Sequence, residues 1–482
     1  MDKKTFLSAS FWSFLQQFGF ISINFVVSIL LARMLMPSDF GVVGIALIFN
    51  SFANIISDGG LSSSLIRNKE VDESDYSIVF IINVVVSIIL YFIIFFSAPL
   101  IADVFNNNKL VLIVRVVTLS IVISSLTIIQ SVKLTKELKF KKKLILGLPA
   151  LLLSGLISIY LAYNGFGVWS LICKDLIFST SLGILLWLDS RWVPKLIFSF
   201  GKFKYHFNYG YKLLLTDLIA KIFNDSYTIV IGKYFSVTQL GLFSRAKSLA
   251  DLPNGIIFSA INRVMFPLLA KVNDDDQRLK HIYSQIIKRV SYSLIPLLML
   301  LLIFAKSIFI FLLTEKWLDA VPYFQVLILV ALMSPLQSYN LNICKVKGRS
   351  DLVLKLSVFK YFLTALSLLT VISFGINGLL WSFLAVTIVE VIFTSYFAGK
   401  LINYTLLEQL NDIKEPFFYS IIAGSTTWTL YNYFFNNFIN EVGILSSGCI
   451  IFTIIYLCLS YIFKNEVYAI FVSAVKSQLK FK

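Results

Sequence analysis

Residues 77–99 read SIVFIINVVVSIILYFIIFFSAP, and this stretch decides the class of the chain. It carries no charged side chain, and roughly 20 mainly apolar residues are enough for a helix to cross the ~30 Å hydrocarbon core of a bilayer. The whole chain of 482 residues is similar, with 58% hydrophobic residues, 14% charged residues and a mean hydropathy of +0.83. Because soluble domains hold only about 45–50% apolar residues, this composition excludes an ordinary soluble enzyme and predicts a polytopic membrane protein.

Apolar runs of this kind predict fourteen transmembrane helices. The expected spans are 9–32, 40–64, 77–99, 110–132, 145–163, 167–188, 211–232, 238–266, 290–314, 322–343, 353–373, 376–399, 416–435 and 442–463. The first run is too long for the apolar region of a signal peptide, and it contains Gln16 and Gln17. We therefore expect it to be a retained helix.

The positions of Lys and Arg predict the orientation. With a cytoplasmic N-terminus, the inside connections hold 30 of the 42 basic residues and the outside connections hold 4; the remaining 8 lie within predicted helices. Cytoplasmic loops of membrane proteins are enriched in Lys and Arg, so both termini are predicted to be cytoplasmic. The formal net charge of +16 is explained by this bias, and nucleic acid is excluded as a partner. All outside connections are short, so no extracytoplasmic domain is expected.

An internal repeat predicts two matched lobes. Residues 31–41 (LARMLMPSDFG) and 231–241 (IGKYFSVTQLG) each connect two expected helices, and at an offset of 200 they share a small–basic–apolar–apolar run and a closing apolar–Gly pair. Six helices separate the two hairpins. Because this number is even, both hairpins face the same side, which is typical of parallel repeats in two-lobed transporters.

The predicted fold is therefore an all-α polytopic membrane protein with two pseudo-symmetric six-helix bundles and two C-terminal helices. Its expected parts are an N-lobe (1–189), a cytoplasmic amphipathic linker (190–210), a C-lobe (211–400), helices 13 and 14 (401–463) and a basic cytoplasmic tail (464–482). The basic segment 133–143 is expected to contact anionic membrane lipids.

Charged residues inside the expected spans mark a candidate binding site. Asp217, Lys221 and Asp225 follow one another at i, i+4 and i+8, which places them on one helix face. Lys221 is about ten residues into its span, roughly 15 Å deep, where an ionisable group costs ~2.5–3.5 kcal/mol on insertion scales. We expect a polar, net-basic cavity for an anionic head group; the alternative is ion pairing of Lys221 with a flanking aspartate.

Other spans add basic residues to this site. The full set of cavity candidates is Lys221, Arg245, Asp225, Asp217, Lys247, Lys174 and Arg263. For Lys247 the alternative is pairing with Asp251, and for Arg245 the two interpretations are equally supported. Five charged residues lie closer to helix ends or in later helices, and most of them are expected to extend toward the membrane surface: Arg115, Arg263, Lys306, Lys360 and Glu390.

No pattern in the sequence predicts catalysis, a metal site or a cofactor. The chain has no G-x-x-x-x-G-K-[ST] loop, no C-x-x-C pair, and only two histidines, His206 and His281, both in polar connecting segments. We therefore expect that the protein is not an enzyme. Coupling to a H⁺ or Na⁺ gradient through Asp217 or Asp225 is left open, as is transport driven by substrate accumulation alone.

Several motifs resemble those of the bacterial polysaccharide flippases. Residues 240–246 (LGLFSRA) are similar to the family pattern L-G-x-Y-S-R-A. Asp225-Ser226 and Ile231-Gly232-Lys233 are similar to the D-N and the I-G-[RK] of the family pattern D-N-x-x-I-G-[RK]. Residues 134–140 (LTKELKF) are similar to L-x-R-E-L-R-F. Ser226 replaces Asn and Phe243 replaces Tyr, and neither departure removes a charge. The resemblance is to the Wzx-type lipopolysaccharide-biosynthesis branch of the multidrug/oligosaccharidyl-lipid/polysaccharide exporter superfamily, which includes colanic acid and teichuronic acid exporters.

The resemblance implies a function and partners. It implies that undecaprenyl-pyrophosphate-linked oligosaccharide repeat units are moved from the inner to the outer leaflet of the bacterial cytoplasmic membrane by alternating access, for O-antigen, capsule or exopolysaccharide synthesis. Polysaccharide polymerase and other assembly proteins are expected partners. The sequence does not specify the sugar repeat, the oligomeric state or the residues that touch the pyrophosphate.

Two alternative functions, a drug antiporter and a membrane enzyme, fit the sequence less well. A cation-coupled drug or organic-cation antiporter of the same superfamily would need buried carboxylates, and the span 9–32 holds no acidic residue. A membrane polymerase or ligase would need a large extracytoplasmic loop, for which the short outside connections leave no room.

Overall fold

The structure is a computed structural model that describes residues 3–190, 192–195, 197, 199–431 and 441–479. Within these ranges the side chains of 3–7, 256–264, 266, 267, 371, 372, 441, 442 and 474–479 are not described. The described backbone forms helices joined by turns and loops, with no strand in these ranges, so the predicted all-α fold is confirmed. Contacts divide the chain into two compact units, residues 1–244 and 245–482.

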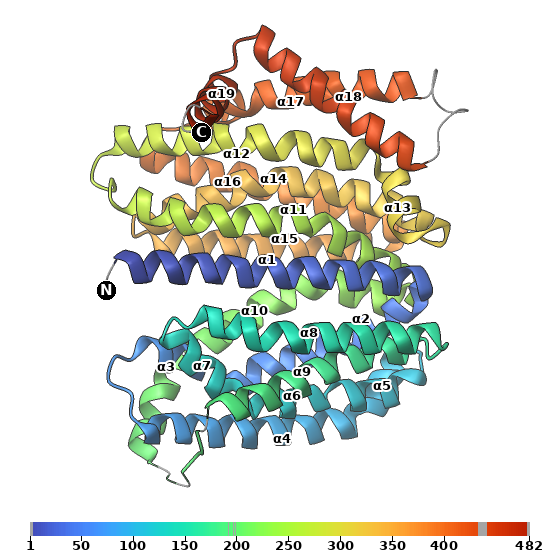
Figure 1. Ribbon diagram of the computed structural model, residues 1–482, viewed down its shortest axis with the longest axis vertical. Helices are drawn as coiled ribbons and strands as arrows, with labels where there is room; N and C mark the ends of the chain where they lie inside the picture. The colour runs from blue at the N-terminus through green and yellow to red at the C-terminus, as the bar shows by residue number, and fades with distance from the viewer. Residues whose placement is uncertain (1–2, 191, 196, 198, 432–440, 480–482) are drawn as a thin grey trace. The chain divides into compact units, whose positions relative to one another are not determined.

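The first unit is built from ten helices and the start of an eleventh. They are α1 (Lys3–Met34), α2 (Pro37–Asp58), α3 (Leu61–Arg67), α4 (Glu73–Val104), α5 (Lys109–Val117), α6 (Leu119–Ser125), α7 (Ile128–Lys136), α8 (Phe140–Tyr163), α9 (Val168–Ser190), α10 (Phe200–Tyr234) and the first residues of α11 (Val237–Ala270). Within this unit α8 packs along both α1 and α9, and the long helices run alongside one another (Figure 1).

The second unit holds the rest of α11 and the helices that follow it. These are α12 (Asp276–Ile303), α13 (Ala305–Leu313), η1 (Glu315–Ala320), α14 (Val321–Val346), α15 (Ser350–Val371), η2 (Ile372–Phe374), α16 (Gly375–Ile402), α17 (Leu406–Leu430), α18 (Glu441–Ile462) and α19 (Glu466–Leu479). Here α14 packs along α16, and α12 packs along α17. The tail that was expected after residue 463 contains the helix α19.

Ten described helices are long and apolar enough to cross a membrane, or eleven if the bent pair 109–125 and 128–136 is one span. The multi-pass membrane class is therefore confirmed. Three of the fourteen expected spans fall on α10, α11 and α17, which are not among the ten. The count of fourteen, and its division into two bundles plus two helices, stays a prediction.

Local sequence explains where the helices begin and end. Asp72 caps α4, since its side chain accepts hydrogen bonds from the backbone N–H groups of Ser74 and Asp75, each at 2.9 Å. The expected span 40–64 is divided between α2 and α3 by Gly59 and Gly60, whose φ angles of 55° and 70° favour glycine.

The connections that were predicted to lie outside gather at one end of the first unit. A Cβ built on Gly232 would lie 3.1 Å from the Phe105 ring, and a Cβ built on Gly167 would lie 4.0 Å from Asp39 Oδ1. We call this the hairpin end, because it holds residues 31–41 and 231–241. The predicted topology places every second connection on the same side of the membrane. The first unit agrees with this, because four such connections contribute residues to this end: Asp39, Phe105, Gly167 and Gly232.

The connections that were predicted to lie inside gather at the other end of α4. Lys133 Nζ is 2.9 Å from Glu73 Oε1, and Lys142 Nζ is 2.9 Å from Asp189 Oδ1. Gly60 and Gly210 touch through their backbones, because a Cβ built on Gly60 would be 2.5 Å from the Gly210 carbonyl oxygen. We call this the lysine-rich end. Which end faces the cytoplasm stays a prediction.

The expected linker 190–210 is not a separate helix in the structure. Its second half forms the first turns of α10, which continues without a break to Tyr234. The first half is held on α4 by Trp192, whose ring centroid is 5.7 Å from that of Phe80 and whose indole N–H donates to Glu73. By contacts α10 belongs to the first unit, and the unit boundary falls within α11. The two lobes expected from the repeat stay a prediction.

Candidate functional site

The two repeated hairpins touch each other reciprocally at the hairpin end. A Cβ built on Gly41 would lie 1.9 Å from the carbonyl oxygen of Val237, and a Cβ built on Gly241 would lie 1.8 Å from the carbonyl oxygen of Pro37. Positions 37 and 237, and 41 and 241, are equivalents at the offset of 200 found in the sequence. Residue i of one copy therefore meets residue j of the other and the reverse, as in a two-fold interface.

This contact joins the first turns of α2 and α11 through their backbones. Only glycine fits at positions 41 and 241, since real side chains essentially never approach a backbone atom within 3.0 Å. One turn farther along, a Cβ built on Gly44 would lie 3.5 Å from Ser244 Oγ, which is ordinary van der Waals contact. We call residues 37–44 with 237–244 the hairpin contact. The two helices are closest at Gly41 and Gly241, and the distance between them increases at Gly44, toward the middle of the helices.

The charged row expected in the 211–232 span lies on α10. Lys221 Nζ is 2.9 Å from Asp225 Oδ2, and the side chains of Lys221 and Asp225 are 31% and 16% exposed. Asp217 is exposed and lies one turn nearer the start of the helix. Thirteen residues separate Lys221 from Tyr234, which is roughly 20 Å at 1.5 Å per residue. The alternative of pairing with a flanking aspartate is thus realised for Lys221, although a third of its side chain stays accessible.

Arg245 lies at the start of the second unit and is buried. Its side chain is only 6% exposed, and its guanidinium carbon is 5.9 Å from the ring centroid of Trp317, itself fully buried in η1. Arg245 is therefore held against an aromatic side chain in this structure.

The remaining candidates lie in both units. Lys247 lines a cavity of about 380 Å³ together with Asp251, but no carboxylate oxygen of the described residues lies within 4.0 Å of its ammonium nitrogen. Lys174 is half-buried on α9 of the first unit. Arg263 is on α11, and its side chain lies outside the described part of the chain. The structure thus joins Lys221 with Asp225 and places Lys247 and Asp251 at one cavity; the binding role of all seven residues stays a prediction.

One buried ionic cluster was missed in the sequence. The Glu390 side chain on α16 is 7% exposed, with Oε2 3.2 Å from Lys360 Nζ on α15. Gln337 on α14 donates from Nε2 to Glu390 Oε1 at 2.5 Å. Glu390 is therefore an exception to the expectation that most of these charged residues extend toward the membrane surface. Its position near the middle of the span 376–399 was a signal, because a central charge needs a partner within the protein.

Replacing Lys360 by Met is expected to destabilise the second unit, since it leaves the Glu390 carboxylate buried without its cation. The expected loss is about 1–3 kcal/mol, less than for a fully enclosed pair because Lys360 is 31% exposed. Thermal unfolding of the purified protein in detergent measures it, with the exposed Lys355→Gln on the same helix as the control. The double variant Lys360→Met/Glu390→Gln should recover part of the loss; equal melting of all variants would contradict a structural role.

The polar cluster at the lysine-rich end of the first unit is structural. Lys202 Nζ lies 2.5 Å from Asp72 Oδ2, and this contact lowers the pKa of the Asp72 carboxyl and raises the pKa of Lys202. His206 is 1% exposed, with Nδ1 2.8 Å from Ser64 Oγ and Nε2 3.4 Å from Asp75 Oδ1. Among the described residues no group of three or more His, Cys, Asp or Glu side chains could hold a metal ion.

Known structures share the fold. The lipid II flippase MurJ in an inward closed conformation aligns with a TM-score of 0.75 at 16% sequence identity, over 94% of this chain and 98% of that one. An inward-facing multidrug transporter of the MATE family aligns with a TM-score of 0.60 at 16% identity, over 79% of this chain and 94% of that one. At these identities the likeness shows the fold alone.

Sequence comparison shows the family. The chain is 24% identical over 428 residues to the teichuronic acid biosynthesis protein TuaB of Bacillus subtilis, covering 87% of this chain and 88% of that protein. It is 25% identical over 359 residues to the lipopolysaccharide biosynthesis protein WzxC of Escherichia coli, covering 74% and 73%. Residues 30–322, more than half of the chain, match the polysaccharide biosynthesis protein family. The chain therefore belongs to that family, and its resemblance to the polysaccharide flippases is confirmed.

Proposed function

We propose that this protein moves undecaprenyl-pyrophosphate-linked oligosaccharide repeat units from the inner to the outer leaflet of the bacterial cytoplasmic membrane by alternating access. Family membership and the relatives' roles in teichuronic acid and lipopolysaccharide biosynthesis support a lipid-linked glycan as the cargo. The observation that carries the proposal is the reciprocal hairpin contact, which supports two matched repeats that meet at one end of a transport path.

The packing at the hairpin contact is suited to a gate that opens and closes one end of the transport path. The tips of α2 and α11 meet backbone to backbone at Gly41 and Gly241, without interlocking large side chains at those two points. Rigid-body motion about an interface is a common form of switching transition, and a close contact between two helix tips is a point at which such an interface would open. In the proposed cycle the hairpin contact is closed while cargo enters from the cytoplasmic leaflet and open when cargo leaves.

The pyrophosphate of the cargo is assigned to the charged row of α10. Lys221 is a cation near the middle of a long helix, and hydrogen bonds between an ammonium group and a phosphate oxygen are strong where water is scarce. Asp225 neutralises Lys221, with Oδ2 2.9 Å from Nζ. Cargo phosphate would take the place of this carboxylate, and Asp225 or Asp217, once released, would be available to a coupling H⁺ or Na⁺.

The antiporter alternative finds less support in the chain. An organic-cation carrier needs carboxylates to hold its cargo, and α1, which leads into the first hairpin, contains no acidic residue. Glu390, the buried carboxylate of the second unit, is already neutralised by Lys360.

Deletion of the gene in a strain that makes surface polysaccharide tests the proposed function. We expect loss of the polymer and accumulation of a lipid-linked repeat unit that is reached only from the cytoplasmic side. As the control, a plasmid copy of the gene should restore the polymer and remove the accumulated lipid-linked repeat unit. Normal export without the protein, or loss of the polymer with no lipid-linked intermediate, would contradict the proposal.

The orientation gives a separate prediction. Cysteines placed at 106 and 165, both exposed at the hairpin end, should react with a membrane-impermeant maleimide in intact cells, and a cysteine at 140 should react only after lysis. The physical reason is the excess of Lys and Arg at the other end, which keeps that end in the cytoplasm. Reaction of the cysteine at 140 alone in intact cells would contradict the predicted orientation and support the opposite one.

A further inference from the structure

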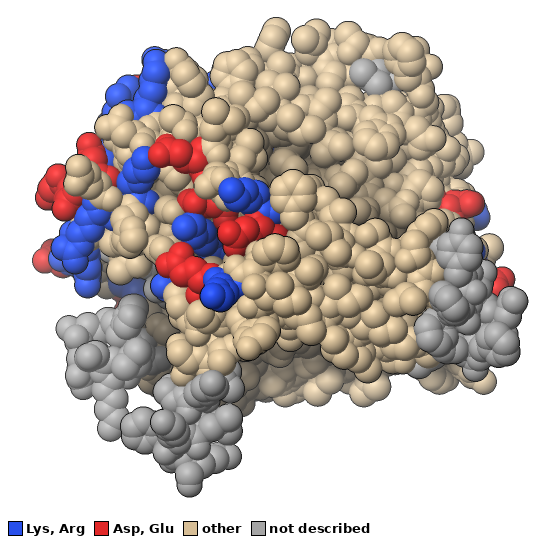
Figure 2. Space-filling model, turned by 90° about the horizontal axis from the view of Figure 1, so that it is seen from above, with Lys and Arg blue, Asp and Glu red and all other residues tan. Residues whose placement is uncertain are grey.

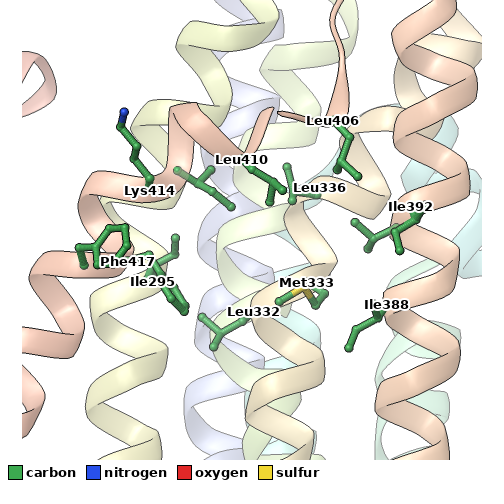
Figure 3. Close-up of a pocket in the computed structure, with 13 residues that line it drawn as sticks. Ile295, Leu332, Met333, Leu336, Ile388, Ile392, Leu406, Leu410, Lys414 and Phe417 are labelled. Atoms are coloured by element: carbon green, nitrogen blue, oxygen red, sulfur yellow. The ribbon is translucent and has the colours of Figure 1, made fainter. Parts of the chain in front are cut away.

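The second unit contains an apolar cavity that the proposed transport cycle does not use. It encloses about 410 Å³ between α12, α14, α16 and α17, within the range of roughly 300–1,000 Å³ typical of ligand sites. Aliphatic and aromatic side chains line it, among them Leu332, Met333 and Leu410 (Figure 3). Among the described residues that line it, Lys414 is the one that carries a charge, and Figure 3 shows the amino group of Lys414 pointing away from the apolar side chains.

Lys414 also lines a second, polar cavity of about 250 Å³ between α12, α17 and the start of α19. This polar cavity contains three lysines, Lys288, Lys414 and Lys464, and three acids, Asp412, Glu415 and Glu466. In Figure 2 most of the charged side chains lie toward the left, a few lie at the right edge, and the broad surface between them shows no charge. An apolar and a polar cavity that share one lysine match a molecule with a hydrocarbon chain and a polar head.

The partners of the acids show which cations are available to a ligand. Lys288 Nζ is 3.6 Å from Asp412 Oδ1 and 3.7 Å from Glu466 Oε2, so this one lysine serves two acids. Glu415 accepts a hydrogen bond of 2.5 Å from Asn465. Among the described residues, no carboxylate oxygen lies within 4.0 Å of the Lys414 or Lys464 ammonium nitrogen.

We propose that these joined cavities bind one anionic phospholipid of the surrounding leaflet, with an acyl chain in the apolar cavity and the phosphate between Lys414 and Lys464. The two lysines select an anionic head group, and basic pockets between transmembrane helices are known to bind such lipids. The site lies wholly in the second unit and is independent of the charged row on α10. It is a resident lipid site, separate from the path proposed for the cargo.

Lipid retention by the full-length protein tests the site. The protein is purified from nanodiscs that contain equal amounts of phosphatidylglycerol and phosphatidylcholine, and the retained lipids are counted by native mass spectrometry. Wild-type protein should retain phosphatidylglycerol selectively. Lys414→Gln/Lys464→Gln should weaken that retention roughly thirtyfold, about fivefold for each lysine. Leu410→Trp, which fills the apolar cavity, should also release the lipid, whereas Lys414→Arg/Lys464→Arg should keep it.

Matched controls use the same substitutions away from the cavities. Lys355→Gln and Leu354→Trp change exposed residues of α15 and should leave retention unchanged. Equal retention of both phospholipids by wild-type protein would overturn the proposal, as would undiminished selectivity in the double glutamine variant. Displacement of phosphatidylglycerol by equimolar undecaprenyl phosphate would also overturn it, since the cavities would then belong to the carrier lipid. Gel-filtration profiles that match wild type establish that the variants are folded.

Discussion

Gly41→Ala and Gly241→Ala are each expected to reduce surface polysaccharide roughly tenfold or more, although each adds a single methyl group. The added carbon would lie 1.9 Å or 1.8 Å from a backbone oxygen of the opposite hairpin, so the tips of α2 and α11 must move apart. Overpacking of this kind costs ~1–3 kcal/mol, which is enough to shift a two-state equilibrium by a factor of roughly 5 to 150. The gate would then stay open, and loading from the cytoplasmic side would fail.

The same substitution at another helical glycine is the control. Gly19 on α1 has no atom within 4 Å of a built Cβ, so Gly19→Ala should leave export and abundance unchanged. A cysteine reporter in the hairpin contact should also react faster with an external maleimide in the Gly41 and Gly241 variants than in the Gly19 variant. Normal export in both gate variants would contradict the assignment of the hairpin contact as the gate.

Lys221→Ala is expected to reduce export roughly thirtyfold while the protein stays inserted and abundant, because one charge-assisted contact to the pyrophosphate, worth about 2 kcal/mol, is lost. Lys221→Arg keeps the charge and should retain most of the activity. Arg245→Ala should act in the same direction. Since Arg245 is 6% exposed and packs on Trp317, this variant should also melt at a lower temperature, which makes Lys221 the cleaner test.

The control for Lys221 is a lysine on the same helix that the account places outside the site. Lys233 is exposed at the end of α10, so Lys233→Gln should export normally. Asp225→Asn frees Lys221 from its 2.9 Å ion pair and should not mimic the loss of the cation. Unchanged amounts of surface polysaccharide in both Lys221→Ala and Arg245→Ala would contradict the assignment of these two residues to the cargo-binding site.

Much of the architecture could be predicted because lipid imposes strong rules on sequence. The uncharged run 77–99 lies within α4. The two hairpins related by the offset of 200 lie at the same end of the first unit, and their contact was not predicted from the sequence. The i, i+4 spacing of Lys221 and Asp225 correctly placed both on one helix face. These features depend only on local periodicity and on charge, which the sequence displays directly.

Features that depend on packing between distant helices could not be predicted. Gly41 and Gly241 look like ordinary residues at helix starts, and only the close approach of two backbones shows why glycine is needed there. The pairing of Lys360 with Glu390, 30 positions apart, requires knowing that α15 and α16 are neighbours. Lys414 is one of many lysines that the sequence predicts on the cytoplasmic side, and the two cavities that share it distinguish it from the others.

A reversible cross-link across the hairpin contact tests the central claim most directly. A Cβ built on Gly44 lies 3.5 Å from Ser244 Oγ, the atom whose place the sulfur of a cysteine would take. In a disulfide a Cβ lies roughly 3 Å from the partner sulfur, as the S–S length of about 2.0 Å requires, so Gly44→Cys/Ser244→Cys should form a disulfide when the contact is closed. The pair is placed in a variant without the four native cysteines, with each single cysteine as a control, and translocation of a lipid-linked repeat unit is measured in reconstituted vesicles. Oxidation is expected to stop translocation, and reduction is expected to restore it. Undiminished translocation with the hairpins fully cross-linked would contradict the account.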